Sequence, residues 1–245
     1  TSTQVINHLL AATQQMVNKS FPAQTLEETF DQYFYPALGT TRQDLQPSID
    51  RFYAQFYPTL RQLTSPQPGS KALMSYVMDQ GHDVVIATNP LFPPTAIEQR
   101  LDWAGFPPGQ TPFKMITNFS DFHFSKPHPA FYAEILAQLG WQDHPAVMVG
   151  DNLQDDLIPA SQLGMPVFWI RQNEQLPPGF HPLSRSGSLE GVLAWIKEIE
   201  ASKFEPQISS PQAILAVLKS TSAAFNQLVL PLTKKQWKTR PQKGE

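Results

Sequence analysis

The chain has 245 residues, a formal net charge of −3 and no cysteine. A chain of this length holds one large domain or two small ones and can bury a core. The slightly acidic balance excludes the basic surface that nucleic-acid binding needs, and the lack of cysteine excludes disulfides and thiolate metal sites. No apolar run approaches the roughly 18 residues of a membrane span. We therefore expect a soluble, cytoplasmic protein that binds neither nucleic acid nor membrane, and the oligomeric state stays open.

Residues 1–65 have the pattern of a helical domain. The first 18 residues place apolar side chains at helical spacing. Further along, Thr25 and Glu28 have the spacing of a capping box, in which each residue satisfies a backbone amide of the other at the start of a helix. We expect this second helix to reach about Tyr35.

A third helix is expected over residues 49–60, and it carries an aromatic stripe. The stripe consists of Phe52, Tyr53, Phe56 and Tyr57. Aromatic residues three to four positions apart lie on one face of a helix. We expect the stripe to pack a small helical core, and the alternative is that part of it lines a substrate pocket.

Residues 66–200 alternate between short apolar runs and helical segments that end at glycine. Four runs have the length and composition of buried parallel strands: 84–87, 115–117, 147–149 and 167–170. Helices are expected around them over 71–80, 94–104, 129–139, 155–163 and 188–199. A loop is expected over 172–187. Repeated units of this kind predict an α/β fold, with a parallel sheet covered by helices on both faces.

Three strand ends carry polar residues suited to a phosphorylated ligand. Thr88 and Asn89 follow the first run, where a hydroxyl and free backbone amides suit an anion. Lys126 stands in a proline-rich turn before a helix, where its charge could neutralise a phosphate. The alternatives are a threonine that only completes a turn and a lysine that is only a surface residue. His128, between two prolines, is expected to be a turn or cap residue, and His123 has no assigned role.

Acidic residues follow the third run. Asp151 comes directly after it, where a hard cation such as Mg²⁺ finds carboxylate oxygen. Asp155 and Asp156 begin the next helix, where acidic residues also stabilise the helix dipole. The dipole alone accounts for Asp155, whereas Asp156 fits either role.

The order and spacing of these residues resemble the haloacid dehalogenase-like hydrolase superfamily. Its second motif resembles Val84-Val-Ile-Ala-Thr88, its third resembles Ser125-Lys-Pro127, and its fourth resembles Gly150-Asp151 with Asp156. The resemblance covers roughly residues 1–200. It implies a Rossmann-like core over 66–200 and an inserted helical cap over 1–65.

The resemblance also implies a chemistry, namely Mg²⁺-dependent hydrolysis of a small phosphomonoester through an aspartyl-phosphate. Thr88 and Asn89 would bind the phosphoryl group, and Lys126 would balance its charge. Asp151 would bind Mg²⁺, with support from Asp156. Dehalogenase chemistry is the less favoured alternative within the family, because acidic residues at this position suit Mg²⁺.

One family motif has no counterpart in this sequence. An apolar strand ending in Asp-x-Asp-x-Thr supplies the nucleophile in the family, yet no Asp-x-Asp occurs before Thr88. We expect the chain to be a piece of a longer protein, inactive by itself and lacking the first strand of its sheet. The alternative is a natural relative without a nucleophile, which binds a phosphorylated ligand or a partner protein.

The last part of the chain has a pattern of its own. Residues 201–210 are expected to be a linker, and residues 211–228 an amphipathic helix. With the basic segment after it, this helix is similar to the start of a DinB-like helical bundle. The alternative for residues 211–245 is a basic C-terminal helix that packs on the core.

Overall fold

The computed structural model describes residues 2–140, 145–202, 204 and 210–229 of the chain. Its α-helices are α1 (Ser2–Asn18), α2 (Leu26–Ala37), α3 (Arg42–Arg51), α4 (Ser70–Asp79), α5 (Pro94–Trp103), α6 (Pro129–Gln138), α7 (Ile158–Ser161), α8 (Leu189–Ser202) and α9 (Pro211–Val229). Tighter or wider helical turns form η1 (Phe52–Phe56), η2 (Tyr57–Leu63) and η3 (Leu153–Leu157). The strands are β1 (Val85–Ile86), β2 (Met115–Ile116), β3 (Met148–Gly150), β4 (Val167–Ile170) and β5 (Arg185–Gly187).

All described strands run parallel, in two separate sheets. β1 pairs with β2, with Val85 opposite Met115. β3, β4 and β5 form the second sheet, in which β4 is the central strand. The α/β class with parallel strands is therefore confirmed; the sequence predicts a sheet that lacks its first strand, and the described strands divide into two sheets. β1 and β3 each pair on one side only, so the backbone groups on their other edges find no strand partner there.

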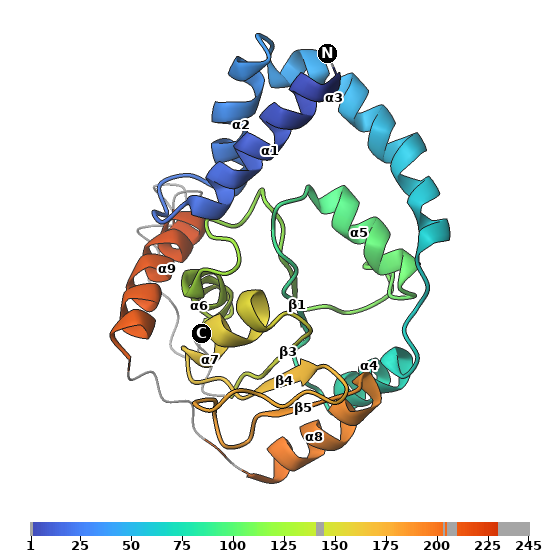
Figure 1. Ribbon diagram of the computed structural model, residues 1–245, viewed down its shortest axis with the longest axis vertical. Helices are drawn as coiled ribbons and strands as arrows, with labels where there is room; N and C mark the ends of the chain where they lie inside the picture. Colours follow the sequence, from blue (N-terminus) through green and yellow to red (C-terminus); the bar gives the residue numbers. More distant parts are fainter. Residues whose placement is uncertain (1, 141–144, 203, 205–209, 230–245) are drawn as a thin grey trace, which may run out of the picture.

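Helices cover both faces of the second sheet, as alternating side chains of β4 show. Val167 and Trp169 belong to the main core cluster, which also contains buried residues of α6 and α7. Phe168 points to the other face and packs with Val192 and Trp195 of α8. In Figure 1, α6 and α7 lie on one side of β4 and α8 lies on the other. The expected two-sided covering is thus present around β4.

The sequence predicts a loop over the whole segment 172–187, but part of this segment is a strand. Its last three residues form β5, which pairs with β4 through Phe168 opposite Arg185 and Ile170 opposite Gly187. The composition Arg-Ser-Gly has no apolar run, so no strand pattern is visible. Pairing with an already formed strand supplies the backbone hydrogen bonds that these residues could not specify alone.

The helical region has a smaller core than expected. Ala12, Phe34 and Tyr35 form a buried cluster between α1 and α2. The capping box of Thr25 and Glu28 is present at the start of α2. By contrast, the helix expected over 49–60 is divided into the end of α3, η1 and η2, none of which has a buried residue.

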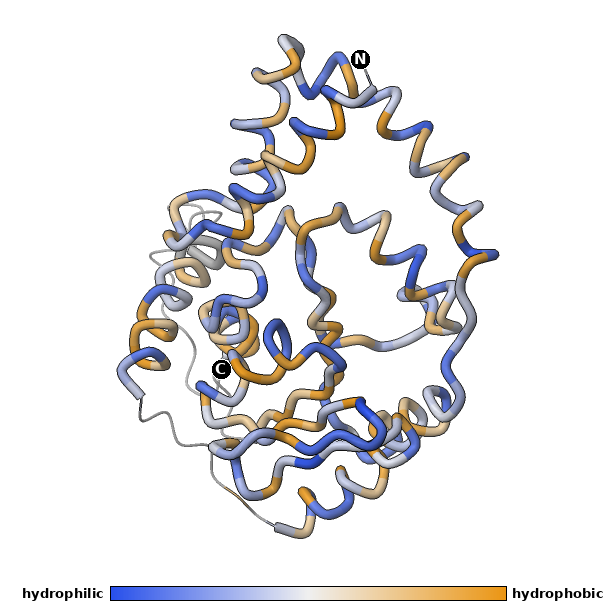
Figure 2. Tube along the Cα trace, viewed as in Figure 1, coloured by the Kyte–Doolittle hydropathy of each residue, from blue (hydrophilic) through white to orange (hydrophobic). Residues whose placement is uncertain are grey.

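The aromatic stripe of η1 and η2 lies outside that core. Phe52 is 45% exposed and Phe56 is 59% exposed. The stripe packs instead ring against ring and against α5, with the Tyr57 and Trp103 ring centroids 5.3 Å apart. Figure 2 shows apolar residues along this segment, which forms the right side of the view in Figure 1. The prediction that the whole stripe packs a helical core is therefore wrong for Phe52 and Phe56.

α9 packs along α6 on the outside of the core (Figure 1). Its small residues Ala213, Ala216 and Ala223 are buried in the main core cluster. This packing agrees with the alternative of a C-terminal helix that packs on the core. The DinB-like resemblance stays a prediction. Residues 230–245 lie outside the described residues. Most of the expected linker also lies outside them, although Ala201 and Ser202 belong to α8.

No helix within the described residues is long and apolar enough to cross a membrane.

Candidate functional site

Lys126 is the most firmly held of the predicted site residues. It is only 7% exposed, and it lies in the loop between β2 and α6. Its backbone amide donates to Asn89 Oδ1 at 3.3 Å, which links the loops that follow β2 and β1. Its ammonium lies 2.5 Å from Asp156 Oδ1. The side chain also passes within 5.9 Å of the Phe131 and Tyr132 ring centroids. The alternative of a surface lysine is therefore wrong.

Asp156 is buried, with 6% exposure, at the start of η3. Besides the ion pair, its Oδ2 accepts the amide of Asn152 at 3.1 Å. It also packs against Gly150 so closely that a Cβ on Gly150 would lie 2.5 Å from the Asp156 Cβ. Only glycine fits at the end of β3 while Asp156 stays in this place. Sterics alone therefore account for glycine at position 150, whatever the chemical role of the acidic residues.

Asp151 differs from Asp156, since its side chain is exposed. Its backbone carbonyl accepts Trp169 Nε1 at 3.0 Å, which fixes the main chain directly after β3. Within the described part of the chain no donor contacts its carboxylate. Asp151 is therefore a carboxylate free to bind a ligand, on a backbone that is held in place.

Thr88 lies two residues beyond β1 and is half-buried. Its carbonyl accepts the hydroxyl of Thr117 at 2.7 Å, and Thr117 is fully buried after β2. Direct contacts join three of the five predicted residues, Asn89, Lys126 and Asp156. Thr88 and Asp151 make no hydrogen bond or ion pair with these three described residues; Thr88 precedes Asn89 after β1, and Asp151 follows β3.

Two supporting residues escaped the sequence analysis. Asn152 caps η3, with its Oδ1 accepting the amides of Gln154 and Asp155; Asn after a strand and before acidic residues is a recognisable cap signal. The Tyr132 hydroxyl donates to the Asp155 carbonyl at 2.9 Å. Burial, reinforced by Asp156 and Asp155, raises the pKa of the Tyr132 phenol well above its usual range. Periodicity marks Tyr132 only as a core residue.

His128 caps α6, because its Nδ1 accepts the amide of Ala130 at 3.0 Å. The expectation of a cap residue is confirmed. Burial lowers the pKa of the His128 imidazole, and Lys219 acts in the same direction.

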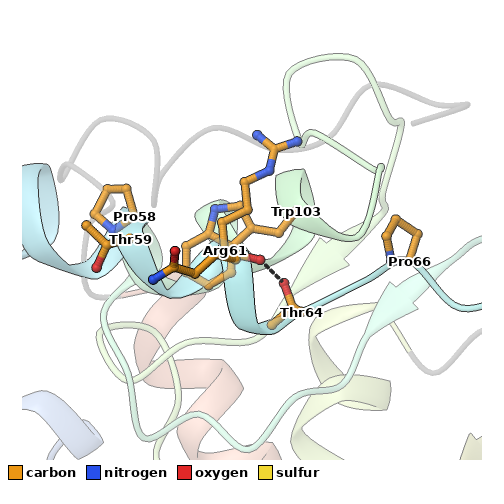
Figure 3. Close-up of a pocket in the computed structure, with 7 residues that line it drawn as sticks. Pro58, Thr59, Arg61, Thr64, Pro66 and Trp103 are labelled. Carbon is orange, nitrogen blue, oxygen red and sulfur yellow. Dashed lines mark hydrogen bonds between the residues drawn. The ribbon is translucent and has the colours of Figure 1, made fainter.

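Two cavities among the described residues lie away from these strand ends. The larger, about 610 Å³, opens between η2 and α5 and is lined by residues such as Arg61, Thr64 and Trp103. Figure 3 shows Trp103 behind the Arg61 side chain, and the Thr64 hydroxyl bonded to the Arg61 carbonyl. A neighbouring cavity of about 330 Å³ is lined in part by Tyr57. No predicted site residue lines either one, so geometry and chemistry, not cavity size, locate the candidate site.

Comparison with known proteins agrees with the motifs. Residues 2–170 match the haloacid dehalogenase-like hydrolase family, which is more than half of the chain. The chain belongs to the haloacid dehalogenase-like hydrolase family. Within that family it is 26% identical to the pyrophosphatase PpaX of Bacillus pumilus over 154 residues, which are 61% of this chain and 69% of the relative.

Solved structures of related hydrolases resemble the chain more distantly. A haloacid dehalogenase-like phosphatase from Thermococcus onnurineus is 17% identical, with a TM-score of 0.46 over 84% of this chain and 94% of the other. An L-2-haloacid dehalogenase is also 17% identical, with a TM-score of 0.48 over 80% of this chain and 84% of the other.

Proposed function

We propose that this hydrolase is a Mg²⁺-dependent phosphatase that acts on a small phosphomonoester at the carboxyl ends of β1 and β3. The buried Lys126, held between Asn89 and Asp156, carries the proposal. A buried ammonium beside a strand end is suited to neutralise the charge of a transferring phosphoryl group. The likeness to a pyrophosphatase supports a phosphate-containing substrate.

Each residue has a proposed role in binding this group. The Thr88 hydroxyl and the Asn89 backbone amide would hydrogen-bond the phosphoryl oxygens. Lys126 would exchange part of its contact with Asp156 for the phosphate, since an ammonium has three donors. The role of Asp156 would then be to hold Lys126 and the turn after β3 in place.

The donors present suit Mg²⁺, which prefers oxygen ligands and commonly takes one or two carboxylates. Asp151 offers an exposed carboxylate that accepts from no donor among the described residues, whereas Asp156 already accepts from Lys126 and Asn152. We therefore assign Asp151 as the direct ligand and Asp156 as its support. When bound there, the ion would neutralise charge on the phosphate.

Catalysis also needs a nucleophile, and no Asp-x-Asp precedes Thr88 in this sequence. We propose that the nucleophile stands on an additional strand between β1 and β3, each of which has one edge without a strand partner among the described residues. The chain by itself is then expected to be inactive toward p-nitrophenyl phosphate.

The test compares three proteins: the chain alone, the chain preceded by an apolar strand ending in Asp-x-Asp-x-Thr, and the same extension with Asn for the first Asp. Only the second should hydrolyse p-nitrophenyl phosphate. Chelation of Mg²⁺ or Asp151→Ala should abolish that turnover. Turnover that survives chelation would contradict the proposed Mg²⁺ dependence, and turnover by the chain alone would contradict the proposed need for the strand.

The lack of a nucleophile favours one further candidate, a protein that binds a phosphorylated ligand or a partner without turnover. Phosphate binding that is lost in Lys126→Met, together with inactivity of the folded extended protein, would support this candidate over the phosphatase.

A further inference from the structure

A buried polar network surrounds the loop that carries Lys126. Glu134 of α6 is fully buried, and its carboxylate accepts the amides of His123 at 3.1 Å and Phe124 at 3.3 Å. Its Oε1 also lies 2.7 Å from His123 Nδ1. Because a buried carboxylate is stable only where donors surround it, these contacts require the loop to bend around Glu134.

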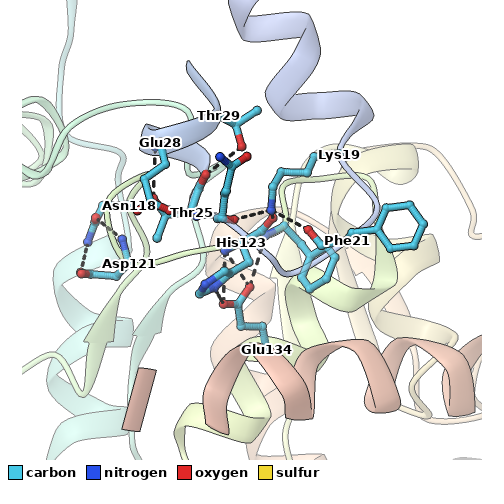
Figure 4. Close-up of polar contacts among 11 residues, drawn as sticks. Lys19, Phe21, Thr25, Glu28, Thr29, Asn118, Asp121, His123 and Glu134 are labelled. Carbon is cyan, nitrogen blue, oxygen red and sulfur yellow. Dashed lines mark hydrogen bonds and ion pairs between the residues drawn. The ribbon is translucent and has the colours of Figure 1, made fainter. Parts of the chain in front are cut away.

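Lys19 reaches the same loop from the opposite side. It lies in the turn between α1 and α2, and its ammonium donates to the carbonyls of Phe21 at 2.6 Å, Gln24 and His123 at 3.1 Å. An ammonium has three donors, so the three acceptors match its full capacity. Figure 4 shows that Lys19, from the turn after α1, and Glu134, from α6, both point toward His123.

Further contacts tie α1 and α2 to this loop. The first amide of α2, Leu26 N, donates to Phe122 O at 2.8 Å. Ser125, which directly precedes Lys126, has its hydroxyl 3.4 Å from Met16 O at the end of α1. Met16 and Leu26 are buried in the main core cluster. The loop is therefore held jointly by α6 and by the α1–α2 pair.

We propose that Glu134 and Lys19 are positioning residues for Lys126, which couple the docking of the α1–α2 pair to the position of this lysine. Glu134 shapes the loop at His123 and Phe124, three and two residues before Lys126, and Lys19 fastens the same point to the turn after α1. Loss of either contact frees the loop and with it the Lys126 ammonium. The importance of that ammonium for phosphate rests on the proposed function, but the coupling itself does not.

Acetylation by an N-hydroxysuccinimide ester, quantified by mass spectrometry at each lysine, tests the proposal without any substrate. The Lys126 side chain is 8% exposed, whereas that of Lys114 is 48% exposed and serves as the internal reference. In Glu134→Gln and in Lys19→Met, acetylation of Lys126 should become about tenfold faster, the effect of losing one hydrogen bond to a charged group. Acetylation of Lys114 should not change.

Two controls separate positioning from general loosening. Lys19→Arg keeps the positive charge but changes the donor geometry, and acetylation of Lys126 should be slower in it than in Lys19→Met. Glu98→Gln, on the exposed side of α5, should leave it slow. Near-ultraviolet circular dichroism identifies the folded variants, and Lys19→Met keeps the test valid if Glu134→Gln does not fold.

Hydrogen exchange tests the coupling to α2. Glu134 contacts His123 and Phe124 but no residue of α1 or α2 in its hydrogen bonds. Faster exchange at the Leu26 and Glu27 amides in folded Glu134→Gln would support transmission through the loop. Unchanged acetylation of Lys126 in folded Lys19→Met, or exchange that changes only at residues 123–124, would overturn the proposal whether or not the protein is a phosphatase.

Discussion

At the scale of single residues, the candidate site depends on side chains that are each fixed by a different physical constraint. Lys126 and Asp156 compensate each other's charge in a place with little water. Gly150 provides the space that Asp156 occupies. Asp151, in contrast, is exposed on a main chain held by Trp169. This buried, compensated pair beside an open carboxylate is the arrangement on which we base the proposal that a phosphate and a cation bind together.

Asp156→Asn should destabilise the protein by about 3–5 kcal/mol, because the buried Lys126 ammonium loses its carboxylate. The free energy of unfolding in urea measures this. The matched control is Asp83→Asn, which breaks the exposed pair with Lys114 at 3.5 Å and should cost less than about 1 kcal/mol. The double variant Lys126→Met/Asp156→Leu should be more stable than Asp156→Asn. Equally small losses of stability in Asp156→Asn and Asp83→Asn would contradict the buried-pair interpretation.

The pH dependence of stability should reveal Lys19. Burial lowers the pKa of the Lys19 ammonium from 10.5 to about 8, although Glu134 and Glu28 act in the opposite direction. Between pH 8 and 10.5 the unfolded chain therefore holds a proton that the folded protein has released, and the free energy of unfolding rises with pH in this window. The wild type should gain stability relative to Lys19→Met between pH 8 and pH 10, as urea titrations at both values would show. No change in this difference would contradict the lowered pKa.

At the scale of elements, local sequence signals and tertiary contacts have separate effects. Both Thr25 and Thr41 complete capping boxes, as their sequences favour. Yet α2 is packed on α1 and on the Lys126 loop, while α3, η1 and η2 bury no residue. Good helix-starting chemistry therefore specifies where a helix begins but not whether it contributes to a core.

Two substitutions of the same residue type should measure this difference. Phe34→Ala in α2 removes a ring that is 7% exposed and should cost about 3–5 kcal/mol, the range for buried phenylalanine. Phe56→Ala in η1 removes a ring that is 59% exposed and should change stability by less than about 0.5 kcal/mol. Urea unfolding of both variants is the measurement. A large loss in Phe56→Ala would show that the aromatic stripe packs a core after all.

At the scale of the whole molecule, the division into two sheets is the main structural feature, because it determines how completely each strand is paired and packed. β4 is paired on both sides, whereas β1, β2, β3 and β5 each pair on one. Val167 to Trp169 are buried, while the residues of β1 and β2 are only partly buried. The protein thus has its most complete packing around β4 and less complete packing at β1 and β2.

Hydrogen exchange followed by mass spectrometry should reproduce this order. Amides of β4 should exchange most slowly, because opening them requires separating two strand pairs and the buried residues between them. Amides of β1 and β3 should exchange faster. In the extended protein with the additional strand, exchange in β1 and β3 should slow while that in β4 changes little. Equal protection of all strands in the chain alone would contradict the division into two sheets.

Some elements and site residues of this protein can be predicted from the sequence, and others cannot. Runs of three or four mainly apolar residues between glycine-terminated helices predict β1 to β4, because buried parallel strands require such composition. β5 was not found, since Arg185 to Gly187 form a strand only through pairing with β4. Lys126 and Asp156 were found from motif spacing. Glu134 and Lys19 were not, because they bind backbone groups of an irregular loop, which for Lys19 lies 104 residues away in the chain.

The sequence alone therefore determined the α/β class, the positions of most helices and strands, and the family, since periodicity, caps and motif spacing are local properties of the chain. The tertiary structure alone decided which groups meet. It pairs Lys126 with Asp156, leaves the Asp151 carboxylate open, and brings Glu134 and Lys19 to opposite sides of one loop. Burial, charge compensation and hydrogen bonding between distant segments depend on how the elements pack, and a linear pattern does not contain that information.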